Sequence, residues 1–175
     1  MTLHPISDGN ENARLSALHS YAVLDTLPER EFDAIVKIAS TYFDVPTVLV
    51  SLVAESRQWF KARVGMEGSE TSRDVAFCDH AIRANEIMVV EDATRDTRFI
   101  NNPLVIGAPY IRFYAGAPLL TPSGQAIGTL CLIDTKARTL SQKDAFVLRA
   151  LSEQVVLLLE LRKSNAQLGD ADYWG

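Results

Sequence analysis

The sequence predicts an α+β fold, in which antiparallel strands form one sheet and helices gather on one of its faces. Two apolar runs within residues 112–135 flank Thr121-Pro122-Ser123-Gly124, and proline followed by glycine is typical of a turn between paired strands. Residues 47–54 and 57–64 are two further short, strand-like runs joined by two polar residues. Longer stretches with helical spacing of apolar residues lie near both ends of the chain.

Length and charge indicate one acidic globular domain. The chain has 175 residues, of which 47% are hydrophobic, and this suffices for one sizeable core. Its formal net charge of −5 argues against a surface that binds nucleic acid or anionic lipid.

The sequence shows no signal peptide, no membrane-spanning run and no disulfide framework, and these three features bear on its cellular compartment. The first residues do not have the pattern of a signal peptide. The longest apolar run of the C-terminal half, Val155–Leu159, is too short to span a bilayer. The two cysteines, Cys78 and Cys131, do not form a disulfide framework. We therefore expect a cytoplasmic protein without membrane contact.

Two helices are predicted before the first strand. Residues 1–11 are polar and are expected to form a flexible lead-in, and from Asn12 apolar residues recur at helical spacing. In the second helix, Thr26 and Glu29 have the spacing of a capping box, and Pro46 marks the end. Its apolar stripe consists of Phe32, Ile35, Val36, Ala39, Tyr42 and Phe43.

The middle of the chain predicts short elements separated by polar segments. Residues 65–74 are expected to form a polar loop, residues 77–84 a short helix and residues 88–90 a short strand. Residues 101–104 predict a short helix or turn, which the Gly-Ala-Pro sequence at 107–109 ends.

The hairpin of residues 112–135 has two chemically different faces. If the turn sets the register, Tyr114 pairs with Cys131. One face is apolar and rich in small residues, as suits helices packed closely on a sheet: Phe113, Ala115, Ala117, Leu119, Ala126, Gly128, Leu130 and Leu132. The other face is mixed and could line a cavity: Arg112, Tyr114, Gly116, Pro118, Ile127, Thr129, Cys131 and Ile133. Pro118 predicts a bulge that would shift this assignment.

A long helix is predicted over residues 141–168, with its end and a tail in residues 163–175. One stripe, apolar except at its last position, runs along it: Leu148, Leu151, Val155, Leu158 and Leu161 or Arg162. A second stripe is added by Val156, Leu157 and Leu159. Because a surface helix needs only one apolar stripe, the second predicts a partner, and we expect a homodimer through residues 141–168.

Several motifs, taken in order, resemble one family. They are ALHSYAVLDTLPEREFDAI, SLVAESRQWFKARVG, TSRDVAFCDHAI, VVEDATRDTRFINNPLV, IRFYAGAPL and IGTLCLID. Together they are similar to the GAF domain, in particular to GAF modules that precede bacterial histidine kinases and diguanylate cyclases. The resemblance covers Ala13 to Arg162, and the domain is placed at residues 12–162. It implies a PAS-like antiparallel sheet with a ligand cavity on one face and the N- and C-terminal helices, often dimeric, on the other.

A cavity of this kind would be lined from the middle of the chain. Asp92, His80 and Arg112 would present polar groups to a small ligand. The other candidate lining residues are Trp59, Phe77, Cys78, Phe99, Tyr110, Tyr114, Thr129 and Cys131. A structural role stays open for each, since aromatic residues form cores and neighbouring charged residues pair with one another. Cys78 and His80 lie roughly 200° apart around a helix, which disfavours a shared catalytic site.

The sequence names no cofactor. GAF domains of phytochrome type attach a linear tetrapyrrole at an adjacent Cys-His, and Cys78-Asp79-His80 departs from that pattern, so a bilin is not expected. The signature of cyclic-nucleotide-binding GAF domains cannot be assembled here, and no metal-ligand spacing such as CxxC occurs. The family's free methionine sulfoxide reductases need several cavity cysteines, whereas this chain has two.

The expected function is non-enzymatic. The chain would be a sensory GAF domain that binds an unidentified small molecule and signals through the terminal helices of a dimer to a kinase or cyclase output module. One alternative is an enzyme that reduces a methyl sulfoxide with Cys78 or Cys131. Another is a structural dimerisation unit whose cavity is closed by Phe77, Phe99 and Tyr114, and it predicts a pocket too small for a metabolite.

Overall fold

The structure is a computed structural model that describes residues 8–172. Its helices are α1 (Asp8–Ser20), α2 (Arg30–Phe43), α3 (Phe77–Ala81), α4 (Pro103–Ile106) and α5 (Gln142–Asp172), with 3-10 turns η1 (Arg73–Val75) and η2 (Ala93–Arg95). Its strands are β1 (Thr47–Val53), β2 (Arg57–Val64), β3 (Glu70–Ser72), β4 (Met88–Val90), β5 (Phe113–Leu120) and β6 (Ala126–Asp134).

The strands form one antiparallel sheet in the order β3-β2-β1-β6-β5-β4. Both predicted hairpins, β1–β2 and β5–β6, are present, and β1 pairs with β6 at the centre. Residues 70–72 were predicted as loop but form the edge strand β3. Their polar side chains suit an exposed edge, which is why an apolar pattern does not reveal this strand.

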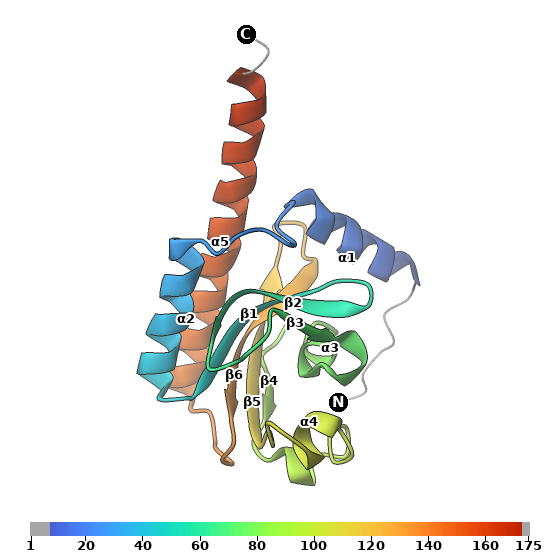
Figure 1. The fold of residues 1–175 in the computed structure, drawn as a ribbon, viewed down its shortest axis with the longest axis vertical. Helices are drawn as coiled ribbons and strands as arrows, with labels where there is room; N and C mark the ends of the chain where they lie inside the picture. Colours follow the sequence, from blue (N-terminus) through green and yellow to red (C-terminus); the bar gives the residue numbers. More distant parts are fainter. Residues whose placement is uncertain (1–7, 173–175) are drawn as a thin grey trace.

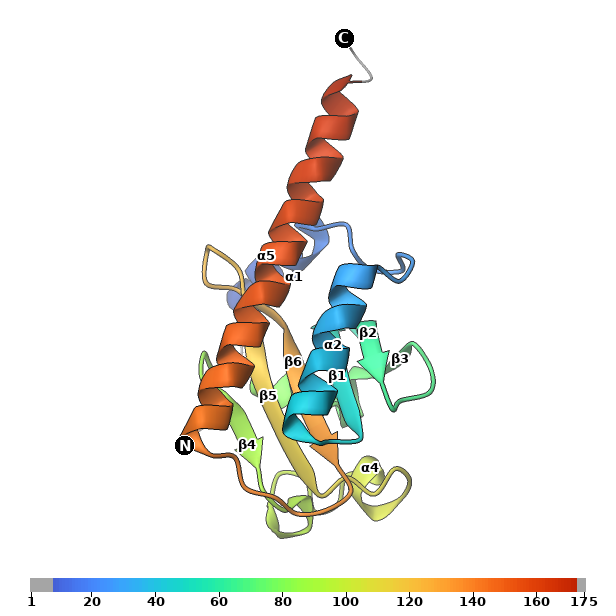
Figure 2. The ribbon, with the colours of Figure 1, turned by 90° about the vertical axis from the view of Figure 1, so that its left-hand side faces the viewer.

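The sheet separates two apolar cores. Helices α2 and α5 lie side by side on one face, as Figure 1 and Figure 2 show from two directions, and α3 and α4 lie beyond the other face. Phe32 of α2 and Val155 of α5 belong to the helix-side core. Phe77 of α3, Phe99 and Tyr114 belong to the opposite core, called the site-side core below. The predicted α+β class is confirmed, although the short helices α3 and α4 lie on the face opposite α2 and α5.

Helix α1 lies across one end of the sheet (Figure 1). Its buried Arg14 donates to the carbonyl oxygens of Val53, at 2.8 Å, and Ala126, at 3.5 Å, which end β1 and begin β6. Leu18, in the last turns of α1, joins the helix-side core. Helix α1 therefore anchors to the sheet through a charged side chain as well as by apolar packing.

Helix ends are the part of the prediction that differs most from the structure. Helix α1 includes residues 8–11, which were expected to be a flexible lead-in. Helix α3 ends at Ala81, earlier than expected, and α5 continues to Asp172, past its expected end. Residues 1–7 and 173–175 of the predicted lead-in and tail lie outside the described residues. Apolar periodicity locates helices but not their last turns.

The predicted capping box of α2 is wrong. Thr26 donates its hydroxyl hydrogen to the carbonyl of Val23, at 2.6 Å, and Glu29 makes no side-chain cap. The Glu29 carboxylate instead pairs with Lys61 of β2, at 2.5 Å, and Arg162 of α5, at 2.8 Å. These charged partners come from distant parts of the chain, so tertiary structure overrides the local cap.

The hairpin of β5 and β6 keeps its predicted faces for most of its length. Tyr114 pairs with Ile133, and Cys131 pairs with Gly116. The register thus differs by two residues from the prediction, and a shift of two leaves each side chain on the same face. Tyr114 and Cys131 lie together in the site-side core, as the alternation predicted.

A bulge near the turn places two side chains on the faces opposite to those predicted. The register between β5 and β6 shifts between Pro118 and Leu120, where Pro118 predicted an irregularity. Beyond the bulge, Ile127 lies in the helix-side core and Ala126 in the site-side core. The predicted faces of these two residues are therefore wrong, because the extra residue inverts the alternation.

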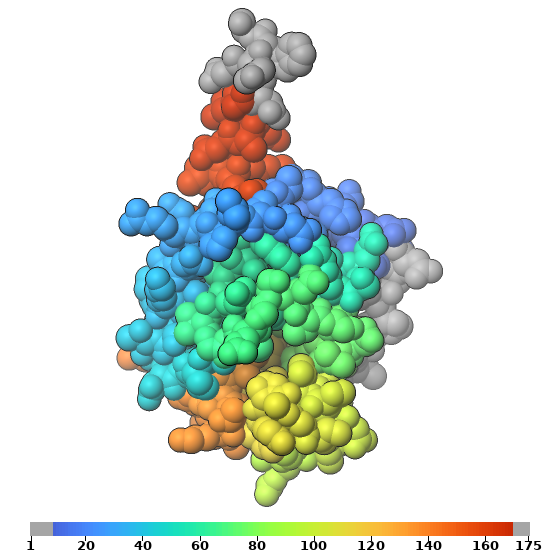
Figure 3. Space-filling view, in the orientation of Figure 1, coloured from blue at the N-terminus to red at the C-terminus, as the bar shows by residue number. Residues whose placement is uncertain are grey.

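Helix α5 buries one stripe and exposes another. The residues buried against the sheet and α2 are Leu148, Ser152, Val155 and Leu159. Leu161, predicted on the buried stripe, is exposed. Large apolar side chains on the exposed side are Phe146, Leu157, Leu161 and Leu168. The C-terminal part of α5 extends beyond the body of the domain (Figure 3). Within residues 8–172, no helix has both the length and the apolar character needed to cross a bilayer.

Candidate functional site

The centre of the site-side core is a buried group of thiols and hydroxyls. Cys78 of α3 and Cys131 of β6 are both buried, and their sulfur atoms are 4.0 Å apart. The hydroxyls of Tyr114 and Thr129 donate to the Cys78 sulfur at 3.2 and 3.1 Å. The hairpin faces predicted that Tyr114, Thr129 and Cys131 lie together. Cys78 joins them because α3 packs over the hairpin.

The tyrosine ring can lie along the strand only because Gly116 follows on the same face. A Cβ added to Gly116 would lie 2.3 Å from the Tyr114 hydroxyl oxygen. Any other residue here would displace the Tyr114 hydroxyl from the Cys78 sulfur. Gly116 is thus part of the machinery that positions this donor.

The pKa values of the two thiols are shifted in opposite directions. The hydrogen bond with Cys131 is the largest effect on Cys78, and with the donors Thr129 and Tyr114 it lowers the Cys78 pKa against the opposing effect of burial. The same contact with Cys78, together with burial, raises the pKa of Cys131 well above its usual value. Cys78 is therefore the more readily ionised thiol of the pair.

A second series of buried, hydrogen-bonded polar side chains was not predicted from the sequence. Ser51 in β1 contacts Gln58 Oε1 at 3.0 Å, and the Gln58 amide donates to Thr71 of β3 at 2.6 Å. The available signal was one serine inside the otherwise apolar β1 and one glutamine inside β2. Both are buried, and such polar residues in a central strand need a partner.

The cavity beside these groups is small. Its volume is about 40 Å³, little more than the space that one water molecule takes up in the liquid, whereas metabolite sites span roughly 300–1,000 Å³. Its lining consists of Leu49, Gln58, Met66, Thr71, Phe77, Cys78, Leu104, Pro109, Ile111, Tyr114 and Ile133. Pro109 is exposed and Met66 and Leu104 are half-buried, so they form its outer part. Phe77 stacks on Phe99 with ring centroids 4.0 Å apart and fills the inner space.

Four predicted site residues lie elsewhere. Trp59 belongs to the helix-side core, and Tyr110 is exposed. The Asp92 carboxylate caps η2 by accepting from Thr94, and these hydrogen bonds lower its pKa. Arg112 donates to the backbone carbonyl oxygens of Val105 and Ile111. In this structure the polar groups of Asp92 and Arg112 already have partners within the chain.

His80 lies at the margin of the site. Its ring is half-buried and meets Phe99 edge-on at 4.8 Å, but it does not line the cavity. Its Nδ1 is buried without a hydrogen-bond partner among the described residues. Desolvation is the largest of the effects that lower the pKa of His80, so the neutral ring is favoured.

A larger hollow lies on the other side of the sheet. It measures about 550 Å³, opens to solvent between α2 and β2, and includes Trp59 and Lys61 in its lining. The Lys61 ammonium is buried but already donates to Thr26 Oγ1 at 2.9 Å and the Leu27 carbonyl at 2.7 Å, and pairs with Glu29. This hollow is open and the buried charge in its lining is already paired, whereas the site-side core holds the buried thiols and hydroxyls around Cys78, so we place the candidate site there.

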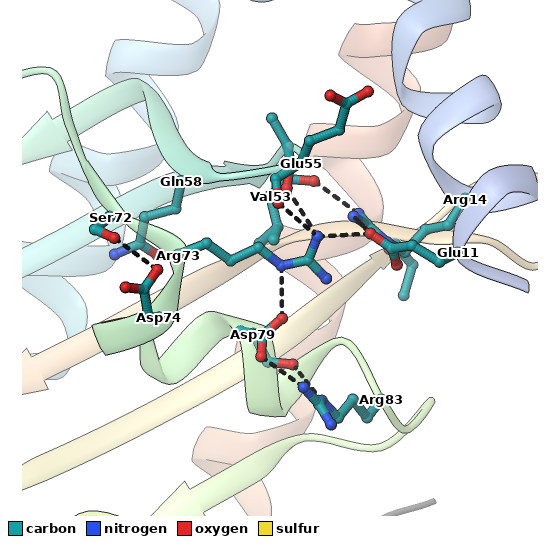
Figure 4. Close-up of polar contacts among 12 residues, drawn as sticks. Glu11, Arg14, Val53, Glu55, Gln58, Ser72, Arg73, Asp74, Asp79 and Arg83 are labelled. Atoms are coloured by element: carbon teal, nitrogen blue, oxygen red, sulfur yellow. Dashed lines mark hydrogen bonds and ion pairs between the residues drawn. The ribbon is translucent and has the colours of Figure 1, made fainter. Parts of the chain in front are cut away.

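A charged network links α3 to α1. Arg73 contacts Glu11 of α1 at 2.6 Å and Asp79 of α3 at 2.8 Å, as Figure 4 shows. Glu11 also pairs with Arg14 at 2.8 Å, and Asp79 with Arg83 at 2.7 Å. The helix that carries Cys78 is thereby tied to the N-terminal helix at the end of the sheet.

This network predicts a loss of stability in acid. The Arg14 hydrogen bond is the largest cause that lowers the Glu11 pKa, from 4.5 to about 2, and Arg73 adds to it. Between these two pH values the unfolded chain binds more protons, so the free energy of unfolding falls as pH falls through that window. Solvent screening reduces the effect to about 1–2 kcal/mol. Urea unfolding at pH 7 and pH 3 measures it.

Between pH 7 and pH 3, the free energy of unfolding of Glu11→Gln should fall by less than that of the wild type. The free energy of unfolding of Glu67→Gln should fall by as much as that of the wild type. Glu67 is exposed and makes no recorded ion pair among the described residues. An equal loss in the wild type and Glu11→Gln would contradict the assignment of this stabilisation to Glu11.

The chain is similar in sequence to proteins of one known family. The GAF domain family model matches residues 28–159. The chain belongs to the GAF family. It is 37% identical over 158 residues to "Cyclic di-GMP phosphodiesterase PA2567" of Pseudomonas aeruginosa, a match that covers 89% of this chain and 27% of that protein. The GAF domain thus spans about a quarter of the length of this relative.

Solved structures confirm the GAF fold at low sequence identity. The GAF domain of the Acinetobacter phosphoenolpyruvate-protein phosphotransferase has a TM-score of 0.64 at 16% identity, with 88% of this chain and 95% of that chain covered. The free methionine-R-sulfoxide reductase of Neisseria meningitidis has a TM-score of 0.63 at 18% identity, with 94% and 98% covered. Since proteins of different function share this fold, the function has to be argued from the site.

Proposed function

We propose that this GAF domain is a non-catalytic regulatory module of a cytoplasmic signalling protein, in a cyclic di-GMP or two-component context. The name of the Pseudomonas relative supports the cyclic di-GMP context, and its extra length leaves room for an output module. The observation that carries the proposal is the exposed apolar stripe of α5, which continues past the sheet. In this proposal α5 transmits the state of the domain to a kinase or cyclase-type output module.

The spacing of this stripe supports pairing of two α5 helices. Phe146, Leu157 and Leu168 follow one another at intervals of three helical turns, so they lie along nearly one line, with Leu161 beside it. Exposed apolar residues that form such a line are typical of a helix–helix interface. A second copy of the chain is the proposed partner.

Leu157→Glu and Leu161→Glu should each shift this dimer toward monomer. A carboxylate at the centre of the apolar seam would be desolvated without a partner, which weakens association by about tenfold or more. Sedimentation velocity at tens of micromolar protein measures it. Ile106→Glu, on the exposed surface of α4, is the matched control and should not change the sedimentation. A wild type that sediments as a monomer would contradict the proposed dimer.

Ligand binding is proposed for the site-side core. Candidate contacts are Phe77, Cys78 and Tyr114, which line the cavity, and Thr129 and Cys131, which contact the Cys78 sulfur. In the described conformation the cavity of about 40 Å³ excludes a metabolite, so binding one requires a second conformation. A ligand can shift this equilibrium only by its difference in affinity for the two states.

Native mass spectrometry of the purified protein tests the ligand. A co-purified small molecule, lost on Phe77→Trp, which fills the cavity further, is the expected result. If the measured mass equals that of the sequence alone, and the protein binds no compound of a metabolite library, the structural dimerisation unit would be supported instead. The small cavity is the observation that favours this alternative.

Sulfoxide reduction is a second candidate function. Two thiols 4.0 Å apart favour it, because they could supply two electrons and close a disulfide. The volume of the cavity weighs against it, since methionine sulfoxide is far larger than a water molecule. Sulfoxide-dependent oxidation of a thiol reductant, abolished by Cys78→Ser or Cys131→Ser, would support this function.

A further inference from the structure

We propose that Cys78 and Cys131 form an oxidisable dithiol, which hydrogen peroxide or a comparably small hydroperoxide converts into an intramolecular disulfide. The proposal concerns the thiols themselves and does not depend on the regulatory function proposed above. Its evidence is the distance between the sulfur atoms, the donors around one of them and the size of the cavity that reaches it.

The first step is geometric. The sulfur atoms are 4.0 Å apart, and a disulfide bond measures about 2.05 Å, so closure needs a movement of about 2 Å. Cys131 lies on the central strand β6, whereas Cys78 lies on the short helix α3. A change of the Cys78 rotamer with a small shift of α3 can supply this movement without disturbing the sheet.

The second step concerns which sulfur reacts. Of the two thiols, Cys78 is the one that receives hydrogen bonds from two hydroxyl groups of the described residues, those of Tyr114 and Thr129. Donors of this kind stabilise a thiolate, and they help lower the pKa of Cys78 while that of Cys131 is raised. Because a thiolate is the nucleophile, Cys78 is the attacking sulfur and Cys131 the resolving one.

The third step concerns access. Cys78 lines the cavity of about 40 Å³, and Cys131 does not. Hydrogen peroxide is only slightly larger than water and fits such a space, whereas a thiol-reactive molecule of metabolite size does not. The exposed Pro109 and half-buried Met66 and Leu104 mark the route from solvent. The cavity thus selects for small oxidants.

The chemistry balances without another cofactor. The Cys78 thiolate attacks one peroxide oxygen, the O–O bond breaks, and Cys78 becomes a sulfenic acid while hydroxide leaves and takes up a proton. The Cys131 sulfur then attacks the Cys78 sulfur, the S–O bond breaks, and the hydroxyl leaves as water with the Cys131 proton. Two thiols lose two hydrogens in all, and one peroxide becomes two waters.

Treatment of the full chain with hydrogen peroxide tests the proposal. Intact mass spectrometry should show the loss of two hydrogens, and a non-reduced digest should contain Cys78 linked to Cys131. Dithiothreitol should reverse both changes. In Cys131→Ser the reaction should stop at a sulfenic acid on Cys78, which dimedone traps. In Cys78→Ser, Cys131 should react at least about tenfold more slowly, because its thiolate is scarce.

Tyr114→Phe tests whether the hydroxyl donor, and not only the short distance between the two sulfur atoms, promotes oxidation of Cys78. The variant keeps the ring but removes one donor, so oxidation of Cys78 should slow several-fold while the circular dichroism spectrum stays unchanged. Cys78 and Cys131 both remaining reduced in folded, peroxide-treated protein would overturn the proposal, provided that the urea-unfolded chain is oxidised. Disulfide formation with methionine sulfoxide but not with peroxide would also overturn it.

Discussion

Gly128→Ala should prevent normal folding or cost about 3 kcal/mol or more of the free energy of unfolding. A Cβ at this position would lie 2.0 Å from the Ser51 carbonyl oxygen and 2.9 Å from Leu52 Cα. Both are backbone atoms of β1, which pairs with β6 at the centre of the sheet. Since the obstructing atoms belong to the backbone, no side chain can move aside and the two central strands would have to separate. The total free energy of unfolding of a small domain is only about 5–15 kcal/mol.

Urea unfolding followed by circular dichroism measures this loss, and Gly9→Ala is the matched control. Gly9 lies in α1, and an added Cβ there would meet no heavy atom of another part of residues 8–172 within 4 Å. Alanine favours a helix over glycine, so this variant should keep the stability of the wild type or gain up to about 1 kcal/mol. A Gly128→Ala protein as stable as the wild type would mean that β1 and β6 do not approach as closely as described.

The fold could be predicted because side-chain alternation survives errors in register. The two hairpins and the helices near both ends of the chain followed from apolar patterns and turn residues. The β5–β6 pairing was two residues off, yet Tyr114 and Cys131 still lie on the predicted face, since the period of a strand is two. The same rule explains the failure at Ala126 and Ile127, where one extra residue inverts the alternation.

The site was predicted only in part because its contents depend on distances across the fold. Cys78 and Cys131 are 53 residues apart in sequence, and their contact at 4.0 Å follows from how α3 docks on the sheet. Ser51 is the one polar residue between Val48 and Val53 of β1, and Gln58 is one of several polar residues of β2, so only their burial shows that they need partners. A closed cavity is a property of packed volumes, which no motif encodes.

Charged residues were the least predictable class. Asp92 and Arg112 were candidates for ligand contacts, yet each satisfies local backbone or hydroxyl groups. Glu29 was expected to cap α2 and instead joins α2 to β2 and α5. Long charged side chains can reach several partners at once, and sequence spacing ranks only the local ones. For such residues the tertiary arrangement decides the role.

Phe77→Ala should cost about 3–5 kcal/mol of the free energy of unfolding and open the cavity. Phe77 is buried, stacks on Phe99 at 4.0 Å and touches the Tyr114 ring with centroids 5.3 Å apart. Removing the ring deletes both contacts and leaves a space that the rigid sheet cannot close. Phe146→Ala is the control, because Phe146 is 75% exposed on α5 and its loss should change stability by less than about 0.5 kcal/mol at low protein concentration.

The enlarged cavity provides a second readout for Phe77→Ala. An apolar space of aromatic size stays dry and accepts a small aromatic molecule, which binds only the folded state. Benzene should therefore raise the midpoint of urea unfolding of Phe77→Ala but not that of the wild type, whose cavity of about 40 Å³ is too small. If benzene stabilised both proteins equally, the native cavity would already open to molecules of that size. The cavity would then not select for small oxidants.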